Sequence, residues 1–175
     1  MKKAKRAAVC FVIIAACFLL ETTLLTLIPF VTVVPNLMII VTSAFGFMRG
    51  KKEGLWIGFA CGLLKDILGG GLLGFNALIY LFLGYCNGFF RRLFYDEDVK
   101  LPIALIGISD FVYGLLVYVC MFMLKSDFNF LFYFRNIIMP ELVYTLLATV
   151  VLYQIIMHVN RRLEEDEKRS ASKFV

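Results

Sequence analysis

The chain has 175 residues, of which 61% are hydrophobic, with a mean hydropathy of +0.85 and a formal net charge of +5. A soluble domain is about half apolar, and the excess here lies in stretches long enough to cross about 30 Å of hydrocarbon. The composition excludes a soluble domain of typical size. The basic residues lie in short segments beside apolar stretches, which also excludes a nucleic-acid-binding surface.

Six apolar stretches predict an all-α integral membrane protein with six transmembrane helices, because lipid cannot satisfy open backbone groups. The first stretch follows a basic start and has no small-x-small cleavage site, so we expect a retained span and no signal peptide. The predicted spans cover residues 7–27, 30–48, 54–70, 72–90, 101–124 and 136–159. They form one domain, residues 1–160, followed by a charged tail at 161–175.

The distribution of Lys and Arg predicts the orientation of the spans. Four basic residues precede the first span, three lie at 49–52, three at 91–100 and five after residue 160. The other side carries two, Lys125 and Arg135, and Lys65 lies within a span. Cytoplasmic loops are enriched in Lys and Arg, so both termini are expected in the cytoplasm (N-in/C-in). The aromatic segment 127–135 is then an outer segment, lying at the headgroups or docking a partner.

Glycine recurs at every fourth position from Gly46 to Gly62. Glycines four apart on an apolar helix allow another helix to approach closely. The expected helix-packing or partner-binding positions are Gly50, Gly54, Gly58, Gly62, Gly84 and Gly88.

Five ionisable residues fall within the predicted spans: Glu21, Lys65, Asp66, Asp110 and Glu141. Such residues are costly at bilayer depth and need a protein partner or a polar cavity. Lys65 and Asp66 point about 100° apart on a helix, so at least one must face another helix. Asp110 is a depth-matched candidate to pair with Lys65, and another carboxylate is the alternative. The cluster is either a structural polar lock or a proton relay or substrate site. The cluster has a single cation and no repeated series of carboxylates along a helix, which favours the structural polar lock.

Signatures of an enzyme are missing from the sequence. His158 is the only histidine, and all five cysteines lie inside apolar stretches without a histidine at metal-ligand spacing. There is no nucleophile elbow, zinc-binding helix or phosphate loop. We expect no catalytic residue, no metal and no cofactor.

An ordered set of motifs resembles the bacterial family of the rod shape-determining protein MreD. These motifs are Pro35-Asn36-Leu37, Gly58-x-x-x-Gly62-Leu-Leu-x-Asp66, Gly71-x-x-Gly74-x-Asn76-Ala-Leu, Tyr80-x-x-x-Gly84-Tyr85 and Arg91-Arg92. The resemblance is densest over residues 35–92. Lys65 departs from the pattern, because the family often has an apolar residue there.

The resemblance implies a non-enzymatic scaffold subunit of the cell-elongation machinery in the bacterial cell membrane, maintaining rod shape and lateral peptidoglycan synthesis. Its partners would be MreC, bound through the glycine face, together with MreB and the elongation glycosyltransferase and transpeptidase. The resemblance leaves open whether the protein also forms a homo-oligomer. The family is also similar in fold to the substrate-binding subunits of energy-coupling-factor transporters, so a vitamin-type transporter subunit is the alternative function.

Overall fold

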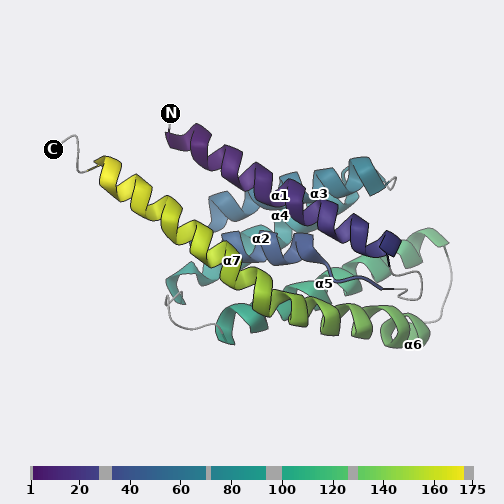
Figure 1. The fold of residues 1–175 in the computed structure, drawn as a ribbon. Helices are drawn as coiled ribbons and strands as arrows, with labels where there is room; N and C mark the ends of the chain where they lie inside the picture. Colours follow the sequence, from purple (N-terminus) through teal and green to yellow (C-terminus); the bar gives the residue numbers. More distant parts are fainter. Residues whose placement is uncertain (1, 28–32, 70–71, 94–99, 126–129, 172–175) are drawn as a thin grey trace.

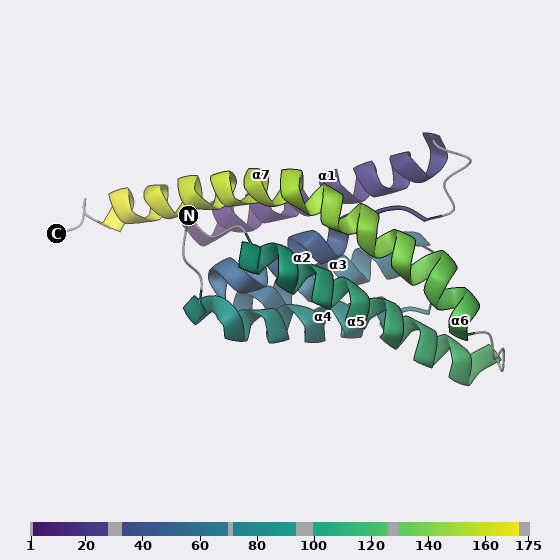
Figure 2. The same cartoon turned by 90° about the horizontal axis from the view of Figure 1, so that it is seen from below.

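A computed structural model describes residues 2–27, 33–69, 72–93, 100–125 and 130–171, and every regular element among them is a helix (Figures 1 and 2). The prediction of an all-α fold is confirmed. In chain order the elements are α1 (Lys2–Leu27), α2 (Leu37–Arg49), α3 (Lys51–Gly69), α4 (Phe75–Asn87), the 3₁₀ helix η1 (Gly88–Leu93), α5 (Lys100–Lys125), α6 (Phe130–Tyr133), the π-helical segment η2 (Phe134–Ile138) and α7 (Met139–Ala171).

The centre of the fold is α2, which packs against α1, α3, α4, α5, α7 and η1. Every residue from Leu37 to Met48 is buried, as expected for a helix that is apolar on all sides. In Figure 1 this helix lies between α1 and α7. The helix has 13 residues, or about 20 Å, and protein rather than lipid surrounds it.

Among the described residues, three helical segments have the length and apolarity of a membrane span, and they lie at Arg6–Thr23, Lys100–Cys120 and Phe130–Glu165. They correspond to the first, fifth and sixth predicted spans. The prediction of a helix over the whole of residues 30–48 is wrong, because α2 begins only at Leu37 and residues 33–36 are not helical. Whether the shorter α2, α3 and α4 also cross the bilayer stays a prediction.

The last helical stretch is longer than the sequence predicts. Residues 130–171 are helical throughout, as α6, η2 and α7 in succession. The aromatic segment is therefore helical from Phe130 onward, and its first residues, 127–129, lie outside the described part of the chain. Most of the expected tail, up to Ala171, continues α7.

The basic segments gather at one end of the bundle, where both termini also lie (Figures 1 and 2). Arg6 of α1 pairs with Glu53 of α3 at 2.7 Å, and Arg49 of α2 lies 3.9 Å from Glu164 of α7. The segments that the Lys and Arg count assigns to the cytoplasm are therefore neighbours in space.

The glycine face is used inside the chain, where it brings α3 against α4 and α2. A Cβ atom at Gly58 would lie 2.3 Å from the carbonyl oxygen of Tyr80, and one at Gly84 would lie 2.1 Å from that of Gly54. Side-chain carbon atoms do not approach backbone so closely, so these helices pack backbone to backbone. Gly54 and Gly62 face α4 at similarly short distances.

Two glycines serve the turn between α2 and α3. Gly50 ends α2 with a φ of +97°, a conformation that favours glycine, and Gly88 packs on the backbone of Lys51. The expectation that MreC docks on the glycine face needs correction, because α4 and η1 already occupy it.

Candidate functional site

The candidate site is a buried polar network that joins α1, α2, α3, α4, α5 and α7. Its ion pair links Lys65 of α3 to Glu21 of α1, with 3.2 Å between Nζ and Oε1. Lys65 Nζ also donates to Tyr80 Oη at 3.2 Å and to Asn36 Oδ1 at 3.4 Å, and it lies 5.3 Å from the ring centroid of Tyr113. The partner of Lys65 is therefore Glu21, and the proposed Lys65–Asp110 pair is wrong.

Asn36 is the centre of this network and is fully buried. Its side-chain oxygen accepts from the backbone N–H of Ile39, which caps the start of α2, and from Tyr80 Oη at 2.7 Å. Its Nδ2 donates to Glu141 Oε1 at 3.4 Å, and its backbone N–H donates to Thr145 Oγ1 at 3.1 Å. One side chain, preceded by Pro35, thus holds α2, α3, α4 and α7 together.

Glu21 also contributes to the start of α2, because its Oε2 accepts from the backbone N–H of Met38 at 3.3 Å. The first N–H groups of a helix have no partner within that helix, and a carboxylate near them is favourable. The same side chain therefore neutralises Lys65 and caps a buried helix.

Asp66 faces away from Lys65 and binds the start of α4. Its two carboxylate oxygens accept from the backbone N–H groups of Gly74, Asn76 and Ala77 at 2.9–3.1 Å, and from Asn76 Nδ2 at 2.9 Å. Gly74, at the N-cap, has a φ of +94° and makes no side-chain cap of its own, so Asp66 acts as the cap from α3. Gly71, the remaining glycine of this motif, lies outside the described residues.

The network continues from Asn76 to α5, because Tyr113 Oη donates to Asn76 Oδ1 at 2.9 Å. Asp110 lies one turn away on the same helix and is buried. Its Oδ1 has no hydrogen-bond partner among the described residues. Four of the five predicted ionisable residues therefore lie in two arrangements, the Lys65–Glu21–Glu141 side and the Asp66 cap. Asp110 interacts with Thr145, which accepts from the Asn36 backbone N–H, and so lies at the edge of the first arrangement.

Several polar residues of the interior could not be predicted from the sequence pattern. Asn87 of α4 donates from Nδ2 to Ser109 Oγ at 2.8 Å and to Ser43 Oγ at 3.3 Å, and it links α2, α4 and α5. Tyr113 and Thr145 were also not singled out. Ser, Thr and Tyr are common in apolar helices, so such a residue is a weak signal for a buried polar contact. Asn87 is the one residue of this group whose amide side chain is unusual enough in an apolar helix to have been noticed.

The Lys65–Glu21 pair leads to a measurable expectation. Replacing one member of a partly buried pair leaves the other charge without its partner, so Lys65→Met should lower the free energy of unfolding by about 3 kcal/mol. Glu21→Gln combined with Lys65→Met should recover part of that loss in a double-mutant cycle. Thermal unfolding of the purified protein in detergent measures both.

The control is the pair Arg6–Glu53 at the more exposed end of the bundle. The Arg6 and Glu53 side chains are 29% and 28% exposed, against 24% and 11% for Lys65 and Glu21. Ion pairs contribute less as their exposure rises, so Arg6→Met should cost less than Lys65→Met. Strictly additive effects of Lys65→Met and Glu21→Gln would show that the two side chains do not interact.

Comparison with known proteins adds the family. The model of the rod shape-determining protein MreD matches residues 2–163, which is nearly all of the described chain. No curated protein and no solved structure matches this chain. The match includes the motif residues that build the Asn36 and Asp66 contacts. The three long apolar helices agree with a membrane location, and the chain belongs to the family of the rod shape-determining protein MreD.

Proposed function

We propose that this protein is a non-enzymatic scaffold subunit of the cell-elongation machinery, which supports rod shape and lateral peptidoglycan synthesis by binding MreC in the membrane. The observation that carries the proposal is the family match over residues 2–163. The geometry of the network is consistent with a structural role, because Asp66 and Asn36 accept hydrogen bonds from the starts of α4 and α2.

The surface for MreC lies on the outside of the bundle in this proposal. Outward apolar side chains are plentiful on α1 and α7, and they include Phe11, Leu19, Val143, Leu147 and Val151. In a membrane these faces meet either lipid or a partner helix. The actin-like MreB, the glycosyltransferase and the transpeptidase would join the same assembly from their own compartments.

Affinity purification of the full chain from native membranes in mild detergent tests this function. We expect MreC to be recovered with the bait. The control bait is an unrelated membrane protein of similar abundance, which should not retain it. Recovery of a transporter ATPase in place of MreC would contradict the scaffold and favour the substrate-binding subunit of a vitamin-type transporter.

The N-in/C-in orientation with six spans is part of the proposal, and the shared end of the termini and basic segments supports it. In a cysteine-free background, Ser126→Cys should react with a membrane-impermeant maleimide added outside the cell, and Ser172→Cys should not. Both positions should react after the membrane is permeabilised. Labelling of Ser172→Cys alone in intact cells would overturn the orientation.

A further inference from the structure

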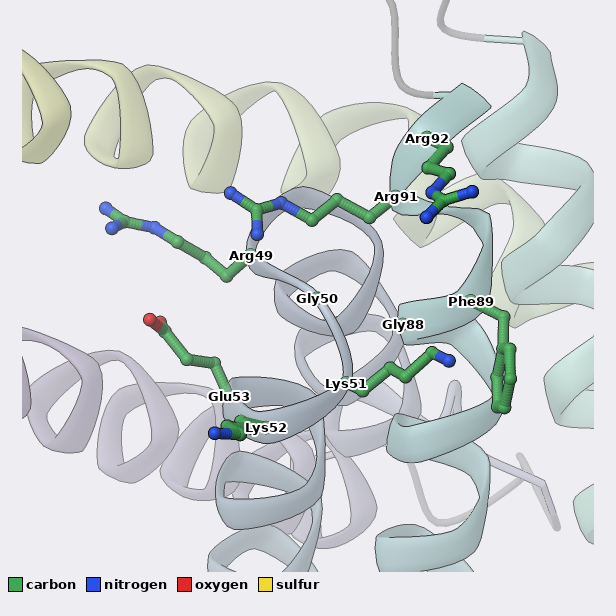
Figure 3. Close-up of a pocket in the computed structure, with 9 residues that line it drawn as sticks. All are labelled: Arg49, Gly50, Lys51, Lys52, Glu53, Gly88, Phe89, Arg91 and Arg92. Atoms are coloured by element: carbon green, nitrogen blue, oxygen red, sulfur yellow. The ribbon is translucent and has the colours of Figure 1, made fainter.

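A basic pocket of about 820 Å³ lies where the turn between α2 and α3 meets η1 (Figure 3). It belongs to the end of the bundle that carries the termini, and it shares no residue with the polar network. Its lining contains five cationic side chains and one carboxylate: Arg49, Lys51, Lys52, Arg91, Arg92 and Glu53.

Two glycines hold the walls of this pocket together. Gly50 turns the chain between α2 and α3 with its positive φ, and a Cβ atom there would lie 2.9 Å from Arg91 Cδ. Gly88 packs on the backbone of Lys51, where a Cβ atom would lie 2.4 Å from Cα. The close approach of η1 to the start of α3 therefore puts Arg91 and Arg92 in the same pocket lining as Lys51 and Lys52.

Part of the charge in this lining, of both signs, is already engaged. Glu53 pairs with Arg6 at 2.7 Å, Arg49 is held by Asn160 and Glu164, and Lys51 Nζ lies 3.4 Å above the ring of Phe89. No carboxylate of the described ranges forms a salt bridge with Lys52, Arg91 or Arg92, all of which are exposed. The start of α3 adds the positive end of a 19-residue helix.

An apolar surface begins at the edge of this pocket. Leu78, Phe82, Tyr85 and Phe89 follow one another at spacings of four, three and four along α4 and into η1, which places them on one helix face. All four are exposed. In a membrane protein such a face meets acyl chains, so the surface offers a cationic site beside a hydrocarbon-facing strip.

We infer that this pocket binds the phosphate of an anionic phospholipid, with the acyl chains lying along the Leu78–Phe82–Tyr85–Phe89 face. Basic pockets between membrane helices on the cytoplasmic side favour anionic headgroups. A single Arg guanidinium can bind two phosphate oxygens at once. A free phosphate would use the cations but not the apolar face. The inference rests on the membrane location and on the proposed orientation, and it is independent of MreC binding.

The test uses the full chain, delipidated in a nonionic detergent, and measures its melting temperature against added phosphatidylglycerol or phosphatidylcholine with identical acyl chains. Phosphatidylglycerol should bind at least about tenfold more tightly, since each Lys or Arg near the headgroups contributes several-fold. The preference should weaken with added salt.

The double variant Arg91→Gln/Arg92→Gln should lose about tenfold of the affinity for phosphatidylglycerol. The matched control is Lys100→Gln/Arg162→Gln, which removes two exposed cations outside the pocket and should bind within about twofold of wild type. A melt of each variant without lipid shows that it is folded.

Two further probes distinguish a lipid from a free anion and cover a misfolded double variant. Inorganic phosphate should stabilise the protein far less than phosphatidylglycerol, and Phe82→Gln should weaken long-chain phosphatidylglycerol more than its dihexanoyl analogue. Equal binding of both lipids by wild type would overturn the inference, as would equal losses in the double variant and its control. Phosphate binding as tightly as the long-chain lipid would overturn the assignment to a phospholipid.

Discussion

Asp66→Leu is expected to lower the free energy of unfolding by about 4 kcal/mol. The substitution removes all four hydrogen bonds that the carboxylate accepts, and it leaves the backbone N–H groups of Gly74, Asn76 and Ala77 without their acceptor. Leucine is at least as apolar as the surrounding helices, so insertion into the membrane should be unaffected. Thermal unfolding of the purified protein in detergent measures the loss.

Asp66→Asn should fall between wild type and Asp66→Leu, at about 2 kcal/mol. The amide oxygen still accepts, but the amide NH₂ faces N–H donors where the second carboxylate oxygen stood. The matched control is the same change at another buried aspartate, Asp110→Asn. Asp110 Oδ1 has no hydrogen-bond partner in the described structure, and an asparagine can keep the contact with the Thr145 side chain, so this change should cost less than about 1 kcal/mol.

The same variants separate a structural cap from a proton carrier. A cap should let Asp66→Asn restore cell shape better than Asp66→Leu in a strain that lacks the protein, with membrane abundance measured in parallel. A proton carrier would be disabled by both changes, because neither side chain titrates. Normal abundance of Asp66→Asn together with a complete loss of rod shape would contradict the structural role.

The helical content and the grouping of the basic segments could be predicted from the sequence, because both follow from composition along the chain. The length of α2 could not. Hydropathy counts apolar residues and does not distinguish lipid from protein as their surroundings. Residues 33–36 belong to the same apolar stretch, yet they are not helical. The Asn36 side chain accepts from the backbone N–H of Ile39, and this N-cap sets the start of α2 at Leu37.

The partners within the polar network were only partly predictable. The angle between Lys65 and Asp66 indicated that the two side chains do not pair with each other, and in the structure they have separate partners. Depth along the membrane normal then suggested Asp110 as the partner of Lys65, but depth carries no information on which helices are neighbours. The structure brings α1 beside α3, so that Glu21 takes this position. The contacts of Asp66 are easier to predict from the sequence, because its hydrogen-bond donors follow it within 11 residues.

The glycine spacing predicted a close helix contact but not its occupant. Periodicity marks the face of α3 that lacks side chains, and either another helix of the chain or a partner could cover such a face. The decisive information is the complementary backbone of α4 at Tyr80 and Gly84, which is visible only once the helices are placed.

Gly58→Ala is the second large effect, with an expected loss of about 3 kcal/mol in the free energy of unfolding. The new Cβ atom would lie 2.3 Å from the Tyr80 carbonyl oxygen and 2.8 Å from its carbon. These are backbone atoms, so no side chain can rotate to make room, and α3 and α4 have to separate. Gly58→Leu should disrupt the pair further. Melting temperature and membrane abundance measure the effect.

Gly69→Ala is the matched control, because Gly69 is also helical and nothing lies within 4 Å of its Cβ position. There the gain in helix propensity, up to about 1 kcal/mol, meets no steric cost, so the protein should be unchanged or slightly more stable. A wild-type melting temperature for Gly58→Ala with a selective loss of MreC would contradict internal packing and restore the glycine face as the partner surface. We expect the opposite order: the melting temperature falls first, and MreC recovery falls only as far as folded protein is lost.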